Sequence, residues 1–205
     1  MRLSDGYHEL EPGRLAAVVT YLQQTERPAV AAAAPPPGME IRRLEKAGLE
    51  RYRALFRAVG EPWLWFSRLR MGDEELTATL NDPGVEVYVL SADGMDQGLL
   101  ELDLRQGPDI EIAFLGVVPE LVGRGAGRLL MNFAIESAWS RAPRRLWLHT
   151  CTLDHPGALR FYQHFGFRAY QRAIEVSPDP RLAGELPRAA APHVPLVLPA
   201  GCDEA

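Results

Sequence analysis

The feature that most constrains this chain is a glycine-interrupted turn between an apolar segment and a long helical segment. Residues 110–118 are mostly apolar, and polar residues recur at every fourth position from Arg128 to Ser140. Between these segments, glycine occurs at positions 123, 125 and 127. Glycine lets the backbone approach a ligand closely, and the first N–H groups of a helix have no partner within it. The turn therefore predicts an anion-binding site, for which phosphate is the natural occupant.

Two well-known phosphate-binding motifs do not describe this turn. No lysine follows the glycines, so the turn is not a P-loop. The glycines occupy every second position instead of following the order G-x-G-x-x-G, so the turn is not a dinucleotide fingerprint either.

A second motif, ALRFYQHFGF at residues 158–167, follows one helix and one strand later. The two motifs in this order resemble the GNAT superfamily of acyl-CoA N-acyltransferases. Its members carry a [Q/R]-x-x-G-x-[G/A] loop for the coenzyme A pyrophosphate, matched by residues 122–127, and an A-x-x-x-Y-x-x-x-G-F segment, matched by 158–167. The resemblance covers about residues 39–170. It implies an α/β fold in which helices flank a mixed, mostly antiparallel sheet and a splayed parallel pair of strands forms the coenzyme A cleft.

The resemblance also implies that acetyl-CoA is the acyl donor and that no metal is needed. Val122 occupies the position of the family's Gln or Arg, and His155 that of an asparagine that often precedes the second motif. We therefore expect backbone amides, together with Arg124 and Arg128, to bind the phosphates. The cofactor-binding residues that follow from the resemblance are Leu115, Gly116, Val117, Val118, Val122, Gly123, Arg124, Gly125, Ala126, Gly127, Arg128, His155, Ala158 and Phe161.

Two residues are candidates for proton transfer. Tyr162 matches the family tyrosine that lies near the thioester sulfur and acts as general acid, and a phenol with a pKa near ~10 is protonated at neutral pH. The alternative is that Tyr162 is a core aromatic residue beside Phe161 and Phe165. Glu111, on the strand that would line the thioester, is the candidate base and would deprotonate an ammonium group through water. The alternative is that Glu111 is an exposed residue at a strand end.

An aromatic cluster precedes these motifs, where the family places its variable acceptor-binding helices. Trp63, Trp65 and Phe66 are the predicted substrate-binding residues and suggest an acceptor with an apolar or ring portion. Glu101 and Asp103, farther along, are expected to be solvated on the polar side of their strand.

A histidine and cysteine group offers a different chemistry. His149, Cys151 and His155 are plausible zinc ligands, and Cys151 is a possible nucleophile. No second cluster completes a metal site and no base for the thiol is evident, so packing within a strand is favoured and no metal is predicted.

The composition excludes other classes of function. The formal net charge is -5, whereas a nucleic-acid-binding surface usually needs a basic field. No segment approaches the roughly 20 apolar residues of a membrane-spanning helix, and the N-terminus has no signal-peptide core. Cys151 and Cys202 are too few for a disulfide scaffold. We expect a cytoplasmic protein that binds neither nucleic acid nor membranes.

Three parts are predicted along the chain. Residues 1–38 comprise an amphipathic helix over 12–26 and a proline- and alanine-rich linker, residues 39–178 form the N-acetyltransferase domain, and residues 179–205 are an extension with a possible strand at 193–198. Within the domain, helices are predicted over 47–59, 62–71, 73–80, 123–142 and 156–165. Strands are predicted over 40–43, 85–90, 100–105, 110–118, 145–151 and 167–176, with the 110–118 and 145–151 strands parallel because a helix connects them.

The predicted function is transfer of the acetyl group of acetyl-CoA directly to a primary amine of a small molecule or peptide. One alternative is a catalytically weak or inactive coenzyme A sensor, which Val122 and His155 favour. Another is an interaction module in which residues 1–38 dock a partner. A homodimer is also possible.

Overall fold

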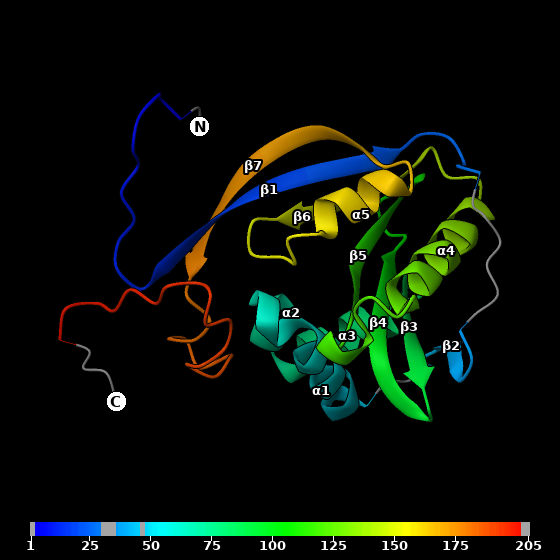
Figure 1. The fold of residues 1–205 in the computed structure, drawn as a ribbon, viewed down its shortest axis with the longest axis horizontal. Coiled ribbons are helices and arrows are strands. Elements are labelled where there is room, and N and C mark those ends of the chain that lie inside the picture. Colours follow the sequence, from blue (N-terminus) through cyan, green and yellow to red (C-terminus); the bar gives the residue numbers. More distant parts are fainter. Residues whose placement is uncertain (1–2, 30–35, 46–47, 202–205) are drawn as a thin grey trace.

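The structure is a computed structural model that describes residues 3–29, 36–45 and 48–201. Seven strands in this part of the chain form one sheet (Figure 1). The strands are β1 (Arg14–Gln24), β2 (Met39–Arg43), β3 (Val85–Ala92), β4 (Met95–Asp103), β5 (Asp109–Val117), β6 (Arg145–Cys151) and β7 (Arg168–Pro178). The helices are α1 (Leu49–Gly60), α2 (Ser67–Arg70), α3 (Asp73–Asn81), α4 (Ala126–Trp139) and α5 (Ala158–His164), with 3-10 turns at Glu61–Trp63 and Pro119–Leu121.

The sheet is mixed, with the strand order β2-β3-β4-β5-β6-β1-β7. Among the described strands, β5 and β6 pair in parallel and all other neighbours are antiparallel. Helix α4 connects β5 to β6, and such a strand–helix–strand connection is the usual route to a parallel pair. The structure thus confirms the predicted mixed sheet with one parallel pair.

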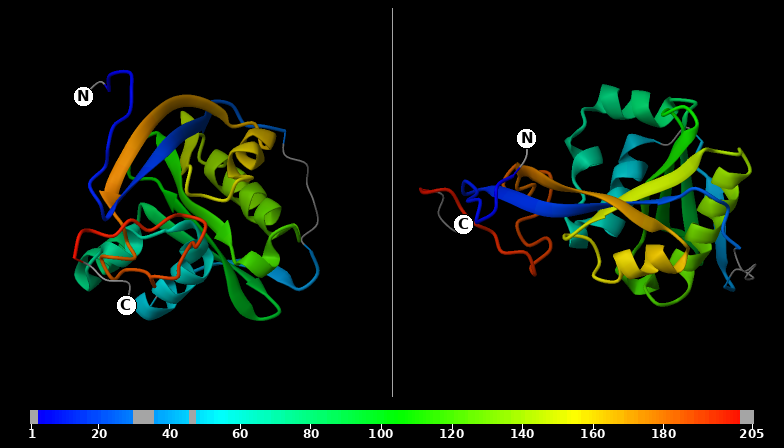
Figure 2. Two further views of the ribbon diagram at one scale, coloured as in Figure 1. Left: turned by 60° about the vertical axis from the view of Figure 1, so that its left-hand side comes forward. Right: turned by 90° about the horizontal axis from the view of Figure 1, so that it is seen from above.

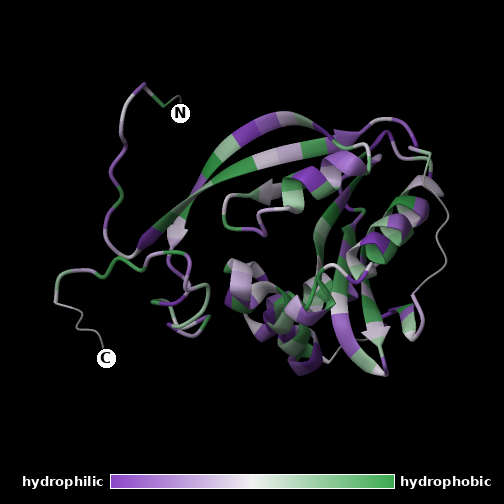
Figure 3. Ribbon diagram, in the orientation of Figure 1, coloured by the Kyte–Doolittle hydropathy of each residue, from purple (hydrophilic) through white to green (hydrophobic). Residues whose placement is uncertain are grey.

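Helices cover both faces of the sheet (Figure 2), with α1, α2 and α3 on one face and α4 and α5 on the other. The side chains of β4 show the two faces: Glu101 reaches Tyr52 of α1, whereas Gly98 lies against Leu130 of α4. Strand β3 is buried along its whole length because both of its sides are covered. Hydrophobic and hydrophilic residues alternate in bands along α4 (Figure 3), as expected for a helix with one buried side.

The helix predicted over residues 12–26 is wrong, because residues 14–24 form strand β1 between β6 and β7. Its side chains alternate, with Leu15 and Val19 buried and Val18 exposed. The β-branched and aromatic run from Val18 onward favours a strand, and a two-residue period fits this alternation. The segment is therefore an inner strand of the sheet and not a helical appendage.

The helix predicted over residues 62–71 is also wrong, because the chain forms a 3-10 turn and then the short α2. Leu64 separates them with a φ of 54°. The following Trp65 donates its backbone N–H to Gly60 and packs its ring against Phe56 and Phe114. These tertiary contacts override the local preference for a continuous helix.

The other predicted elements of the domain occur in the structure, most of them with shifted ends. The helix after the glycine turn begins at Ala126 and ends at Trp139, several residues inside its predicted limits. Residues 30–35 of the predicted linker, Ala47 at the predicted start of a helix, and Cys202 lie outside the described residues. No helix in the described ranges is long and apolar enough to cross a membrane.

The strand predicted at residues 193–198 does not form. Arg181 organises this segment instead: its buried guanidinium pairs with Asp179 and donates to the carbonyl oxygens of Ala190 and Val194. Prolines in the segment lack the N–H groups that a strand ladder needs. A second, small core joins it to β1 and to the turn before α2; its buried members are Leu15, Leu64, Leu186, Ala190 and Ala191.

A buried charge ties α1 and α2 to the sheet. Glu101 of β4 is fully buried, contrary to the expectation that it is solvated. Its carboxylate accepts a hydrogen bond of 2.7 Å from the Tyr52 hydroxyl and forms an ion pair with Arg68. Burial raises the pKa of Tyr52 well above its ordinary value, and the Glu101 carboxylate raises it further. Asp103, also expected to be solvated, is buried and paired with Arg105.

We predict that Arg68→Met lowers the free energy of unfolding by about 3–5 kcal/mol, because removing one member of a buried pair leaves an uncompensated charge. Urea unfolding measures the change. The double variant Arg68→Met/Glu101→Leu should recover part of this loss, since it removes both charges. An Arg68→Met protein as stable as the wild type would show that Glu101 does not depend on Arg68.

Candidate active site

The parallel strands β5 and β6 separate soon after they meet. They pair over Asp109–Glu111 and Arg145–Trp147, and no described residue beyond these continues the pairing. Two cavities, of about 420 Å³ and 460 Å³, are lined by residues of β5 beyond this point. The unpaired edge of β5 presents backbone N–H and C=O groups to them, and such groups need partners.

An extra residue in β5 decides which side chains face the smaller cavity, the one of about 420 Å³. Glu101 of β4 pairs with Phe114 and Leu102 pairs with Ile112, so Ala113 is a β-bulge. Side chains alternate along a strand, and without the bulge Glu111 and Phe114 would point to opposite faces. With it, both point to the face covered by α1 and α2.

The larger cavity lies at the glycine turn. Gly123 and Gly125 have φ values of 80° and 86°, which only glycine adopts readily, and Gly125 begins α4 without a side-chain cap. The first N–H groups of α4 are therefore free to bind an anion. Of the predicted cofactor-binding residues, those that line this cavity are Leu115, Gly116, Val117, Val122, Gly123, Gly125, Gly127, Arg128, His155, Ala158 and Phe161.

The remaining predicted cofactor-binding residues do not line the larger cavity. Val118 and Ala126 are buried in the core, and Arg124 is exposed on the turn. Gly116 has a separate reason to be glycine: a Cβ there would lie 2.5 Å from Val59 and 3.1 Å from the ring of Trp65. The wall of the cavity is therefore packed too closely to admit a side chain at this position.

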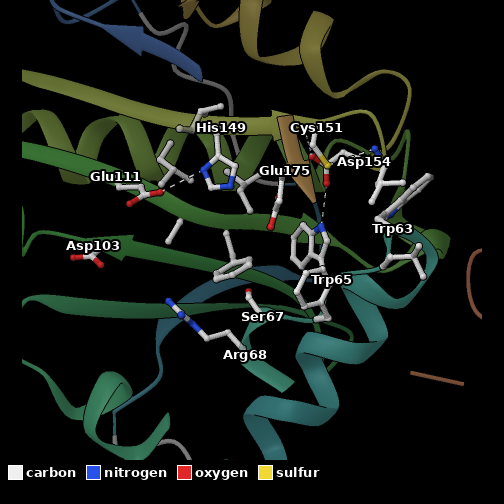
Figure 4. Close-up of a pocket in the computed structure, with 18 of the residues that line it drawn as sticks. Trp63, Trp65, Ser67, Arg68, Asp103, Glu111, His149, Cys151, Asp154 and Glu175 are labelled. Atoms are coloured by element: carbon white, nitrogen blue, oxygen red, sulfur yellow. Dashed lines mark hydrogen bonds and ion pairs between the residues drawn. The ribbon is translucent and has the colours of Figure 1, made fainter. Parts of the chain in front are cut away.

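The smaller cavity lies on the α1 and α2 face of the sheet (Figure 4). Glu111 of β5, His149 of β6 and Glu175 of β7 point into it from three strands. The predicted substrate-binding residues Trp63, Trp65 and Phe66 line it, and so does Phe114.

The two cavities share a wall. Its members, which line both cavities, are Trp63, Trp65, Leu115, Asp154 and Tyr162. Asp154 holds this wall together, because its carboxylate accepts hydrogen bonds from the indole N–H of Trp65 at 3.0 Å and from the Thr150 hydroxyl at 2.7 Å. Tyr162 comes from α5 on the opposite face of the sheet and reaches both cavities at the separation of β5 and β6.

The phenol of Tyr162 is protonated at neutral pH. Burial raises its pKa well above the ordinary value of a tyrosine, and the charge of Asp154 raises it further. Among the described residues, no hydrogen bond occupies its hydroxyl group, although the residue is half-buried. The hydroxyl is therefore available to a ligand at the junction of the cavities.

The charges around the smaller cavity are mostly acidic. Its two arginines are already paired, Arg68 with Glu101 and Arg105 with Asp103. Within the described part of the chain, Glu111, Asp154 and Glu175 have no arginine or lysine partner. The cavity thus favours a cationic ligand over a carboxylate, and the anion-binding turn lies at the other end of the site.

The histidine and cysteine group does not form a metal site in the described ranges, where no three potential ligands converge. The His149 ring faces Glu111, whereas His155 packs against Trp63 and accepts the backbone N–H of Gly157. Burial raises the pKa of the Cys151 thiol to about 11, with Asp154 adding to the effect. A thiol of this kind is protonated at neutral pH and is a poor nucleophile.

Asp154 and Glu175 are not among the predicted site residues, and His149 is considered there as a zinc ligand, with packing favoured. No local motif marks them. Glu175 reaches the cavity because β7 pairs with β1, where it lies opposite Ala17, and β1 pairs with β6. Only the order of the strands in the sheet identifies Glu175 as a site residue, and the sequence did not reveal that order.

We predict that Cys151 reacts slowly with iodoacetamide at pH 7 in a Cys202→Ser background. The rate should rise about tenfold per pH unit toward pH 11, since only the thiolate reacts. Mass spectrometry of the alkylated protein measures it. Rapid, pH-independent alkylation near neutrality would indicate a thiolate and restore Cys151 as a candidate nucleophile.

Comparison with known proteins agrees with this geometry. Residues 52–167 match the model of the acetyltransferase (GNAT) family. The fold is similar to a structure described as a GNAT-family acetyltransferase from Novosphingobium aromaticivorans, with 19% identity and a TM-score of 0.57 over 82% of this chain and 69% of that chain. It is also similar to a GCN5-related N-acetyltransferase from Sphaerobacter thermophilus, with 22% identity and a TM-score of 0.59 over 82% and 52% of the two chains.

A third similar structure is an aminoglycoside acetyltransferase from an uncultured soil metagenomic sample, with 21% identity and a TM-score of 0.55 over 67% of this chain and 93% of that chain. Identities this low establish the fold alone, and the chain spans only 52% of the Sphaerobacter protein. No curated protein sequence matches the chain. The family model, however, covers more than half of the chain and includes both the glycine turn and the tyrosine of α5, so the chain belongs to the GNAT acetyltransferase family.

Proposed function

We propose that this protein transfers the acetyl group of acetyl-CoA directly to a primary amine of a small molecule or peptide. The observation that carries the proposal is the junction of two cavities at Tyr162, with an anion-binding turn at the end of one and carboxylates in the other. A thioester bound along the larger cavity would place its carbonyl carbon where an amine in the smaller cavity can reach it.

The larger cavity suits the donor. The uncapped N-terminus of α4 and the guanidinium of Arg128 would bind the pyrophosphate, with the backbone of the turn filling the role of the side chain that Val122 lacks. The open edge of β5 at Leu115 and Gly116 would bond to the amide groups of the pantetheine arm. In this arrangement the thioester lies beside the shared wall.

The chemistry then requires a neutral amine and an acid for the leaving thiolate. The acceptor ammonium loses a proton to a base in the smaller cavity, and the amine attacks the thioester carbonyl. As the carbon–sulfur bond breaks, Tyr162 donates its proton to the thiolate of coenzyme A. The attacking nitrogen loses its remaining extra proton as the amide forms, and this proton returns through water to the tyrosinate. No covalent acyl-enzyme is needed, which agrees with the protonated state of Cys151.

The acceptor is expected to be cationic and partly apolar. The carboxylates of Glu111, Asp154 and Glu175 attract an amine in its ammonium form, and the rings of Trp63 and Trp65 offer an apolar or cation–π surface. Aminoglycosides, the acceptors named for one structural relative, have this polycationic character but lack aromatic rings. We expect the protein to act in the cytoplasm, where acetyl-CoA is made and used.

We predict that Tyr162→Phe lowers kcat by roughly a hundredfold and leaves the Kd for acetyl-CoA within about twofold, since the hydroxyl group acts mainly on the leaving thiolate. Thiol release and calorimetry measure the two quantities. Tyr170→Phe, on β7 outside both cavities, is the matched control. Equal losses of turnover and affinity would show that Tyr162 is structural.

We predict that Gly125→Asp weakens acetyl-CoA binding about tenfold more than Gly125→Asn does. The two side chains have similar shape and tolerate a positive φ similarly, so their difference isolates the repulsion between a carboxylate and the phosphates. Isothermal titration with acetyl-CoA, with ATP and NAD as controls, measures the affinities. Equal affinities of the two variants for acetyl-CoA would show that its phosphates do not bind at this turn.

Wild-type protein that binds acetyl-CoA but releases no thiol with any primary amine tested would instead favour a coenzyme A sensor.

A further inference from the structure

We propose that His149 is the group that accepts the proton of the acceptor ammonium, and that Glu111 acts through His149 as a positioning residue. This inference rests on the proposed function, and it replaces Glu111 as the direct base. The geometry of the smaller cavity points to it.

The two residues come together through the register of the sheet. Glu111 pairs with Trp147, so His149, two residues farther along β6, points to the same face. The distance between His149 Nδ1 and Glu111 Oε1 is 3.6 Å. An Nδ1–H directed at the carboxylate leaves the lone pair on Nε2, which is the atom that can accept a proton from a ligand in the cavity.

The exposure of the two side chains favours His149 over Glu111 as the group that accepts the proton. The His149 side chain is 44% exposed within the open cavity, whereas the Glu111 side chain is 13% exposed. The second carboxylate oxygen of Glu111 accepts a hydrogen bond of 3.3 Å from the side-chain amide of Gln106. Gln106 thus engages one oxygen of Glu111 and Nδ1 of His149 faces the other, while among the described residues nothing hydrogen-bonds to Nε2 of His149.

Acidic groups from three directions face His149. Glu111 lies on β5, Glu175 on β7, and Asp154 in the segment that follows β6. The carboxylate of Glu111 raises the pKa of His149 against the opposing effect of burial, and Asp154 and Glu175 raise it further. Tyr21 of β1 contacts the ring at a centroid distance of 5.7 Å. Cys151 follows on β6, and its thiol is protonated near pH 7 because burial raises its pKa to about 11.

The proton balance is complete without another reactant. An N–H bond of the acceptor ammonium breaks and its proton moves to Nε2 of neutral His149. The resulting imidazolium is stabilised by Glu111 and later releases the proton to water. Because the raised pKa belongs to a base that must be neutral to act, activity is lost as the pH falls through that pKa and is present above it.

The coupling is tested by NMR titration of the imidazole signals. The His149 signal is assigned by its disappearance in His149→Gln. We expect it to titrate above the ordinary range for histidine in the wild type, and at lower pH in Glu111→Gln. His8, an exposed histidine near the N-terminus, should titrate identically in both proteins. A His149 titration unchanged by Glu111→Gln would overturn the pairing.

The role in proton transfer is tested by the pH dependence of kcat/KM, measured as thiol release with the fastest of a panel of primary amines. The same amine is used for every variant, so its own ionisation cancels. We expect His149→Gln to lower kcat/KM by about a hundredfold and to abolish the acidic limb. Glu111→Gln should keep the limb but move it to lower pH. His8→Gln should match the wild type.

The rival arrangement predicts the reverse. If Glu111 were the direct base, Glu111→Gln would abolish the acidic limb, and His149→Gln would keep it at the same or higher pH because a neighbouring positive charge had been removed. That result would overturn the proposal while the proposed function stood. A wild-type protein that acetylates no amine would overturn both, and the NMR titration would then report a structural pair alone.

Discussion

The separation of β5 from β6 is the constraint on which the site depends. The strands pair only as far as Glu111 and Trp147, and beyond that point the sheet has an opening instead of a ladder. An opening in the middle of a sheet leaves backbone groups without partners, which is costly unless a ligand or water supplies them. It also connects the two faces, so that Tyr162 from one face and Trp65 from the other line the same cavities.

The distribution of charge gives the site its two ends. Arg68 and Arg105 would make the smaller cavity neutral or basic, but buried carboxylates of β4 already pair with them. The unpaired carboxylates that remain make the smaller cavity acidic, whereas the glycine turn, the uncapped start of α4 and Arg128 lie at the larger cavity. A donor with phosphates and an acceptor with an ammonium group would therefore enter at different ends and meet at the shared wall.

Much of the fold, and most of the lining of the larger cavity, was predictable because local patterns specify them. The glycine turn, the helix after it and the tyrosine motif are contiguous segments whose geometry follows from their own residues. The errors occurred where distant contacts decide the outcome. Residues 14–24 carry an apolar pattern that fits helix and strand alike, and pairing with β6 and β7 selects the strand. Leu64 interrupts a predicted helix because Trp65 is held by Asp154, 89 residues away in sequence.

The sequence by itself determined the family, the mixed sheet and the residues of the glycine turn, because short-range backbone preferences and spacing encode them. The tertiary structure alone decided the smaller cavity. Glu111, His149 and Glu175 lie on three strands far apart in the chain, and they meet only through the pairing of β5 with β6 and the insertion of β1 between β6 and β7. A one-residue change of register would turn each of these side chains to the other face, and no local pattern records which register the sheet adopts.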